Sequence, residues 1–201
     1  GRRGERIIMS TGMSTIQEVE DAVQVLENAG TPRSNIYLLH CTTQYPTPMS
    51  DVNLRAMHAL DALGCAGIGY SDHTQGIEVP VAAVAMGAKI IEKHFTLDRT
   101  LPGPDHRASL EPQELKAMVA AIRNIELAMG SGTNDVADAE RPNIKVARKS
   151  IVAARDIRRG EILCEENLTV KRPGNGLSPM LWDSVIGTQT IDDFNYDTLI
   201  R

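Results

Sequence analysis

The sequence predicts an α/β fold, in which a parallel sheet with helices on its outer side is followed by a small, mostly β domain. Between residues 7 and 130, a strand-like run followed by a helix-like run recurs about every 30 residues, as in proteins built from βα units. After Gly130 the chain becomes small, polar and acidic, and from Val146 short β-like pieces alternate with turns. We therefore expect one domain over residues 1–130, a linker over residues 131–145 and a second domain over residues 146–201.

Four short apolar runs predict the strands of the sheet. Runs of this length, bounded by turn residues, are typical of parallel strands that are buried on both faces. The four runs are Arg6–Ser10, Ile36–Thr42, Gly67–Ser71 and Lys89–His94.

A helix is predicted after each strand from its start signals, its apolar spacing and a terminating glycine. Thr15 and Glu18 have the spacing of a capping box at the start of the first helix, and so do Ser14 and Gln17. Proline stands in the first turn of the third and fourth helices, where its missing N–H does little harm. The four helices are expected to end at Gly30, Gly64, Gly87 and Gly130.

The number of βα units fits half of a TIM barrel. Such a barrel closes with eight strands, whereas the first domain supplies only four strand-like runs. The first of these runs begins a few residues after the start of the chain. We therefore expect the second half of a TIM (β/α)8 barrel. We expect this piece alone to be inactive, because an open half-barrel exposes its sheet edges.

Composition argues against several classes of function. The 201 residues are 42% hydrophobic and 23% charged, which is typical of a globular protein with a real core. The net charge of -5 argues against a nucleic-acid partner, and the aromatic content of 3% argues against base stacking. No apolar run approaches the roughly 20 residues that cross a bilayer, so we expect no membrane span. The three cysteines lack framework spacing, which favours reduced thiols in the cytoplasm.

Two histidines stand at the carboxyl ends of the third and fourth predicted strands. His73 and His94 are thus placed where α/β proteins keep their chemistry. Two imidazoles at one mouth indicate a divalent metal site or an acid/base pair. Side chains alternate across a strand, so residues two apart share a face. If these faces point inward, a polar cluster that suits an anionic substrate and a cation lies at the mouth: Ser10, Thr43, Tyr45, Ser71, His73 and His94.

Other polar residues have simpler interpretations. A lone strand histidine is more often a hydrogen-bonded core residue, and we interpret His40 in this way because its parity is opposite to that of Cys41. Lys93 is expected on the outer face, against helices or in a salt bridge. Asp105 lies in a strand-to-helix loop, which fits either a rigid proline turn or a rim that contacts a hydroxylated ligand. The segment Lys171–Gly176, a basic pair followed by turn residues, is typical of a solvated turn.

Five segments, spread in order along the chain, carry a family resemblance: Leu39–Pro46, Gly69–Thr74, Glu92–Thr96, Pro102–Asp105 and Lys171–Gly176. They closely resemble motifs of the bacterial sialic acid synthase family, which includes N-acetylneuraminate and legionaminic acid synthases. Five ordered motifs are far more specific than any one of them. The family combines a TIM barrel with a small domain similar to type III antifreeze protein, which is called an SAF domain.

The resemblance implies a metal-dependent transferase. It would condense phosphoenolpyruvate with N-acetylmannosamine, or a related N-acyl mannosamine-type sugar, to give a sialic (nonulosonic) acid and phosphate. The resemblance implies that His73 and His94 hold Mn²⁺ or Mg²⁺ and act in catalysis. It implies that Ser10 and Ser71 hydrogen-bond phosphoenolpyruvate, near Thr43, where some members of the family have Asn.

The resemblance also assigns the sugar contacts and the assembly. It implies that Tyr45 and Asp105 contact the sugar. Arg172 would reach the active site of the partner in a domain-swapped homodimer and bind the sugar's N-acyl group. In the family, the phosphate-binding lysines and the acid/base glutamates lie in earlier strands.

Three alternatives remain open at this stage. The same chemistry could act on the diacetamido precursor of legionaminic acid, which product mass spectra with each sugar would decide. The small domain could be a non-catalytic saccharide- or ice-binding module, which thermal hysteresis of residues 146–201 would test. A related aldol-type synthase acting on another aldehyde sugar is the third. The charges of Arg148, Lys149, Arg158 and Arg159 argue against a flat, weakly polar ice-binding surface.

Overall fold

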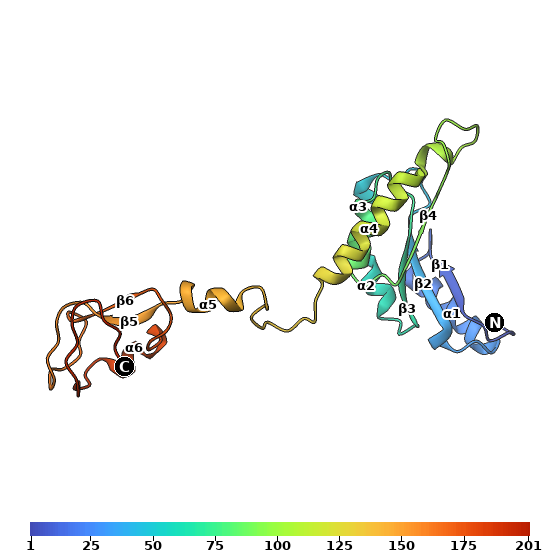
Figure 1. The fold of residues 1–201 in the computed structure, drawn as a ribbon. Helices are drawn as coiled ribbons and strands as arrows, with labels where there is room; N and C mark the ends of the chain where they lie inside the picture. Colours follow the sequence, from blue (N-terminus) through green and yellow to red (C-terminus); the bar gives the residue numbers. More distant parts are fainter. The chain divides into compact units, whose positions relative to one another are not determined.

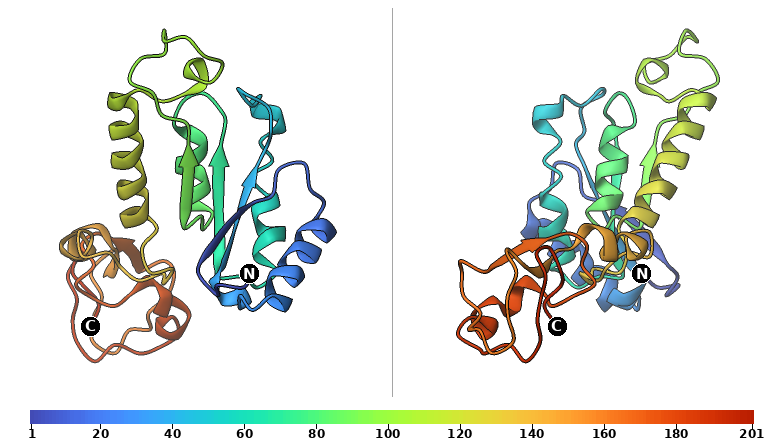
Figure 2. Two further views of the ribbon diagram at one scale, coloured as in Figure 1. Left: turned by 90° about the vertical axis from the view of Figure 1, so that its right-hand side faces the viewer. Right: turned by 60° about the vertical axis from the view of Figure 1, so that its left-hand side comes forward.

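Four parallel strands, hydrogen-bonded in chain order, form the sheet of the first of two units. The computed structural model describes residues 1–201, which divide into Gly1–Gly132 and Thr133–Arg201. Because all three strand pairings are parallel, the carboxyl ends of the strands meet at one edge of the sheet (Figure 2). The order along the sheet is β1 (Ile7–Ser10), β2 (Ile36–Cys41), β3 (Gly67–Asp72) and β4 (Ile90–Lys93).

A helix follows each strand, as the sequence predicts. Figure 1 shows α2, α3 and α4 on one side of the sheet. The second helix is expected from the sequence to start near Asp51, but it starts only at Ala56. Met49–Asp51 forms a 3-10 turn, and Asn53 adopts a left-handed φ of 46°, which interrupts the helix before Ala56. The helices are α1 (Ile16–Asn28), α2 (Ala56–Asp61), α3 (Glu78–Ala85) and α4 (Pro112–Ala128), with further 3-10 turns at Arg33–Asn35 and His106–Ala108.

The start of α1 shows which of two possible capping pairs is used. The Oγ1 of Thr15 accepts from the backbone N–H of Glu18 at 3.3 Å, and the Glu18 carboxylate accepts from the backbone N–H of Thr15 at 2.7 Å. The bonds that the carboxylate accepts from the backbone N–H and the hydroxyl of Thr15 lower the pKa of Glu18. The Ser14 hydroxyl instead donates to the carbonyl of Gly12. The capping box formed by Thr15 and Glu18 therefore fixes where the β1–α1 loop ends. From this start, the buried side of α1, which carries Val19 and Val23, faces the sheet.

The hydrophobic core lies between the outer face of the sheet and the helices. Buried strand residues pack there against α1, α2 and α3, and a second cluster surrounds α4. The opposite face of the sheet is more open, since Ile8 is 52% exposed and Ser10 and Glu92 are exposed. This is the architecture of half a TIM barrel. The main core residues are Val19, Val23, Ile36, Leu38, Met57, Leu60, Ile68, Tyr70, Val79 and Ala83.

The second unit is a small domain with little regular structure. Strands β5 (Ser150–Ala153) and β6 (Leu168–Lys171) form an antiparallel pair in a part of the chain where the sequence predicts short β pieces. Helix α5 (Arg141–Ala147) begins within the segment expected as a linker, and α6 (Trp182–Val185) follows a 3-10 turn at Pro179–Leu181. No helix in the structure combines the length and hydropathy needed to cross a bilayer. The core of the unit comprises Ile151, Ala153, Ile157, Leu163, Leu168 and Ile200.

We predict that Gly69→Ala destabilises the first unit. A Cβ at this position on the inner face of β3 would lie 2.5 Å from the carbonyl oxygen of Ile90 and would overlap Leu39. The Ile90 oxygen belongs to the backbone of β4 and cannot move without disturbing the sheet. We expect a loss of about 1–3 kcal/mol in the free energy of unfolding, typical of an overpacked site. Denaturant unfolding measures it, and an unchanged midpoint with an unchanged slope would contradict the close approach.

Candidate active site

Three aromatic rings meet at the carboxyl end of the sheet. His73 follows β3 and His94 follows β4, and the register pairs the preceding residues Asp72 and Lys93 directly across the two strands. The ring centroids of His73 and His94 lie 5.4 Å apart, with the planes inclined at 71°. The ring of Tyr45 lies 4.1 Å from that of His73 and 5.4 Å from that of His94. The structure thus brings together three residues that the sequence assigns to the mouth.

The orientation of His73 is fixed by its backbone surroundings. Its Nδ1 lies 2.7 Å from the carbonyl oxygen of Thr42, which can only accept a hydrogen bond. Nδ1 therefore carries the proton, and the other nitrogen, Nε2, lies 3.4 Å from Ser71 Oγ. The carbonyl of His73 accepts from the backbone N–H of Thr47 at 2.8 Å, and the residue is only 8% exposed. A ring held in this way has no freedom to redirect Nε2.

Ser71 links His73 to a carboxylate. Its Oγ donates to Oε1 of Glu92, the residue opposite it on β4, at 2.6 Å. A hydroxyl has one proton, and the much shorter distance assigns it to Glu92. When His73 is neutral, the lone pair of Nε2 therefore faces an acceptor oxygen. Three electron-rich groups converge here, which is an arrangement that a cation or an added proton satisfies.

Glu92 is the site residue that sequence reasoning missed. Parity places it on the same face of its strand as His94, and the structure shows it exposed on the inner face, bonded to Ser71. The signal was present in the alternation of β4.

The other residues predicted for the site lie outside the cluster of His73, His94 and Tyr45. Ser10 on β1 pairs with Leu39, which pairs with Gly69, so Ser10 faces inward one level below Ser71. Thr43 follows β2 and contacts the turn after β1, because a Cβ on Gly12 would meet its Cγ2. Asp105 is exposed in the loop between β4 and α4. Arg172 belongs to the second unit, where its Nε donates to the carbonyl of Ala147 at 3.1 Å.

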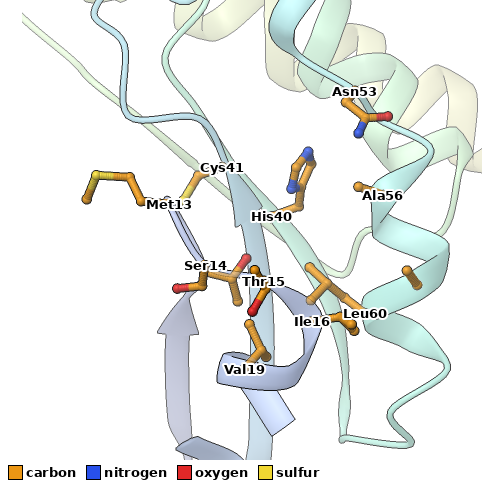
Figure 3. Close-up of a pocket in the computed structure, with 12 residues that line it drawn as sticks. Met13, Ser14, Thr15, Ile16, Val19, His40, Cys41, Asn53, Ala56 and Leu60 are labelled. Atoms are coloured by element: carbon orange, nitrogen blue, oxygen red, sulfur yellow. The ribbon is translucent and has the colours of Figure 1, made fainter. Parts of the chain in front are cut away.

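The residues that the sequence assigns to packing are found in that role. His40 Nε2 lies 2.9 Å from the carbonyl oxygen of Val52, and its ring packs on that of Tyr70. Figure 3 shows His40 beside a pocket of about 380 Å³ between the start of α1 and α2. Burial raises the pKa of the Cys41 thiol, which keeps it protonated at neutral pH. Lys93 forms an ion pair on the outer face of the sheet.

The donor set of the mouth suits an open metal site rather than a closed structural one. The described residues contain no group of three or more His, Cys, Asp or Glu side chains that could hold a metal ion. The two imidazoles could supply two nitrogen ligands and leave the other positions to substrate oxygens and water, as catalytic sites require. The hydrogen bond from Nδ1 of His73 to a carbonyl is the usual partner of a metal-binding histidine. The residues present therefore fit a divalent cation.

We predict that neutral His73 is the Nδ1–H tautomer, since the Thr42 carbonyl can only accept. Nitrogen-15 NMR of labelled histidine, recorded at a pH where the ring is neutral, distinguishes the two tautomers. The exposed ring of His58 on α2 serves as the internal control, because rapid exchange with solvent will leave it a mixture. A predominant Nε2–H signal for His73 would contradict the hydrogen bond to Thr42.

Comparisons with known proteins identify the two parts of the chain. The sequence model of the NeuB family matches residues 1–134, and that of the SAF domain matches residues 148–201. Two curated relatives are N,N'-diacetyllegionaminic acid synthases. The protein from Campylobacter jejuni is 51% identical over 98% of this chain and 59% of its own length. That from Legionella pneumophila is 44% identical over 91% of this chain and 52% of its own length.

A solved structure gives the same assignment. The N-acetylneuraminic acid synthetase of Leptospira borgpetersenii, determined in complex with citrate, superposes with a TM-score of 0.62 at 41% identity. The match covers 70% of this chain and 48% of that one. The matches therefore span about half the length of these relatives, from 48% to 59%. The match over residues 1–134 shows that this chain belongs to the NeuB family, the family of sialic acid synthases, with an SAF domain at residues 148–201.

Proposed function

We propose that the protein to which this chain belongs condenses phosphoenolpyruvate with an N-acyl mannosamine-type sugar and consumes one water molecule, giving a nonulosonic acid and phosphate. The observation that carries the proposal is the convergence of His73 and His94, whose ring centroids lie 5.4 Å apart at the mouth of a NeuB-family half-barrel. The relatives named above are synthases of nonulosonic acids, which supports the reaction class.

The two histidines are proposed to hold a divalent cation, Mn²⁺ or Mg²⁺. Nε2 of His73 is available for this, because its Nδ1 proton is bonded to Thr42. The ring of His94 lies next to it, with no intervening element. A cation bound there supplies Lewis-acid activation of the sugar's aldehyde oxygen toward attack by carbon 3 of phosphoenolpyruvate.

The inner face of the sheet is proposed to bind phosphoenolpyruvate. Ser71 and Ser10 lie on neighbouring levels of that face, and hydroxyl groups can position the carboxylate or phosphate. Glu92 accepts the hydrogen bond of the Ser71 hydroxyl, so Ser71 would donate to the bound anion only by giving up that bond when phosphoenolpyruvate enters. Thr43 is proposed as a further contact from the β2 end. Lys93 cannot neutralise the phosphate, because it is bonded to Asp72 on the other face.

The sugar is proposed to lie above the histidines. Tyr45 is 46% exposed and its ring lies beside that of His73, so part of it is accessible to a ligand that enters the mouth. Asp105 is exposed in the loop on the same side and is proposed to accept hydrogen bonds from sugar hydroxyls. The legionaminic names of the two curated relatives favour the diacetamido sugar over N-acetylmannosamine. Product mass spectra with each sugar decide between them.

The assembly is proposed to be a domain-swapped homodimer in the cytoplasm. Arg172 is exposed on the SAF domain and is proposed to bind the N-acyl group of the sugar in the partner's active site. All three cysteines are free, which supports a reducing compartment.

We predict that His73→Ala and His94→Ala each abolish metal-dependent turnover. In the native full-length protein, phosphate release from phosphoenolpyruvate plus sugar should fall by at least about 10³-fold, because the cation loses one of its two protein ligands. EDTA should stop the unmodified protein, and added Mn²⁺ should restore it. His58→Ala, at an exposed position on α2, is the matched control and should keep full activity. Undiminished turnover in EDTA, or in either active-site variant, would refute the metal-dependent reaction.

We predict that Arg172→Ala raises the KM for the sugar by about tenfold or more and leaves the KM for phosphoenolpyruvate near its original value. The loss of one charge-assisted hydrogen bond accounts for a change of this size. Arg158→Ala, also exposed on the small domain, is the control. Light scattering should report a dimer for all three proteins. A monomer with full activity, or an unchanged sugar KM in Arg172→Ala, would rule out the swapped arrangement.

A further inference from the structure

An ion pair is buried on the face of the sheet that points away from the mouth. Nζ of Lys93 lies 2.5 Å from Oδ2 of Asp72, and the two side chains are only 3% and 0% exposed. The residues are partners in the β3–β4 register, and each directly precedes a histidine of the site. Because side chains alternate, the ion pair lies on one face of the sheet and the two imidazoles on the other.

The pair also holds the backbone on both sides of His73. Oδ1 of Asp72 accepts from the backbone N–H of Thr74 at 2.9 Å, and Nζ of Lys93 donates to the carbonyl oxygen of Thr74 at 2.6 Å. The residues before and after His73 are therefore tied to the side chain that precedes His94. The ammonium group of Lys93, on β4, therefore bonds both to the end of β3 and to the residue that follows His73.

Stability alone is a weak reason for this arrangement. Removing two charges from water costs several kcal/mol per ion, and a buried pair often contributes no more than apolar residues of the same size would. The surrounding outer face is apolar: Ile91, the preceding outward residue of β4, packs against the cluster around α4. What an ion pair adds over an apolar contact is direction, because its bonds fix distance and angle between the two strand ends.

We propose that Asp72 and Lys93 are positioning residues, which set the separation and direction of the His73 and His94 imidazoles so that both can bind one divalent cation. The proposal rests on the proposed function for the identity of the ligand. The geometry of the two rings can also be tested without any metal, so the two claims can fail separately.

The test compares single and double variants in the native full-length protein. Asp72→Asn and Lys93→Met each leave a partner unpaired, whereas Asp72→Leu combined with Lys93→Met replaces the pair by apolar groups. Arg33→Met is the control: Arg33 is paired with Glu20 and Glu27, precedes β2 and so lies at the opposite end of the strands. The measurements are the thermal unfolding midpoint, the Mn²⁺ dissociation constant by calorimetry, and the nuclear Overhauser effect between the His73 and His94 rings.

The double variant separates positioning from stability. We expect its unfolding midpoint to lie above those of both single variants, because it leaves no unpaired buried charge. It should still lie somewhat below that of the unmodified protein, because the backbone N–H and carbonyl of Thr74 lose their side-chain partners. We expect its Mn²⁺ affinity to be 10- to 100-fold weaker, the range seen when a residue that supports a metal ligand is lost. The inter-ring signal should weaken in parallel. Arg33→Met should bind Mn²⁺ normally, whatever its effect on the midpoint.

The Mn²⁺ affinity and the inter-ring signal of the double variant decide whether the proposal stands. A folded double variant that binds Mn²⁺ with unchanged affinity, and keeps the inter-ring signal, shows that the pair positions nothing. If the unmodified protein binds no Mn²⁺, the proposed metal site fails, and the inter-ring signal alone then decides. Its loss in the double variant supports the positioning role, and its persistence rejects that role.

Discussion

The parallel hydrogen bonding of β3 to β4 is the constraint on which the site depends. Its register sets Ser71 opposite Glu92 and Asp72 opposite Lys93, so the residues that follow, His73 and His94, emerge side by side. Ser71 and Glu92 lie on the inner face and form a hydroxyl–carboxylate hydrogen bond in the mouth. Asp72 and Lys93 lie on the outer face and form a buried ion pair. A slip of one residue in this register would exchange the faces and separate the histidines from their neighbours.

The two faces of the sheet have different roles. The outer face buries its aliphatic side chains and Tyr70 against α1–α4, and this burial holds the strands in place. The inner face is polar near the carboxyl ends, where the exposed carboxylate of Glu92 can bond to a ligand and the buried Ser71 donates to that carboxylate. Rigidity on one side therefore supports accessible chemistry on the other, which is how barrel folds carry varied reactions on a common frame.

Membership of the NeuB family and the presence of an SAF domain give this geometry a functional setting. Synthases of this family must bring together an anionic enol phosphate and a neutral sugar aldehyde. The described mouth has acceptors and imidazoles that suit a cation, and hydroxyl groups that suit an anion beside it. Under the proposed function, one small set of side chains would serve both substrates, and a bound cation would reduce the repulsion between electron-rich groups.

Alternation and spacing in the sequence determined the βα units, the small β domain and the residues that share a face. His73, His94, Ser71 and Tyr45 were predicted at one mouth, and His40 and Lys93 away from it, because strand parity is a local property of the chain. Tertiary structure alone decided the rest: the carboxylate oxygen to which Ser71 donates, the hydrogen bond of His73 Nδ1 to Thr42, and the pairing of Asp72 with Lys93. Those bonds join residues on different strands or in separate loops, and their distances depend on the register and packing of the whole sheet, which no local pattern encodes.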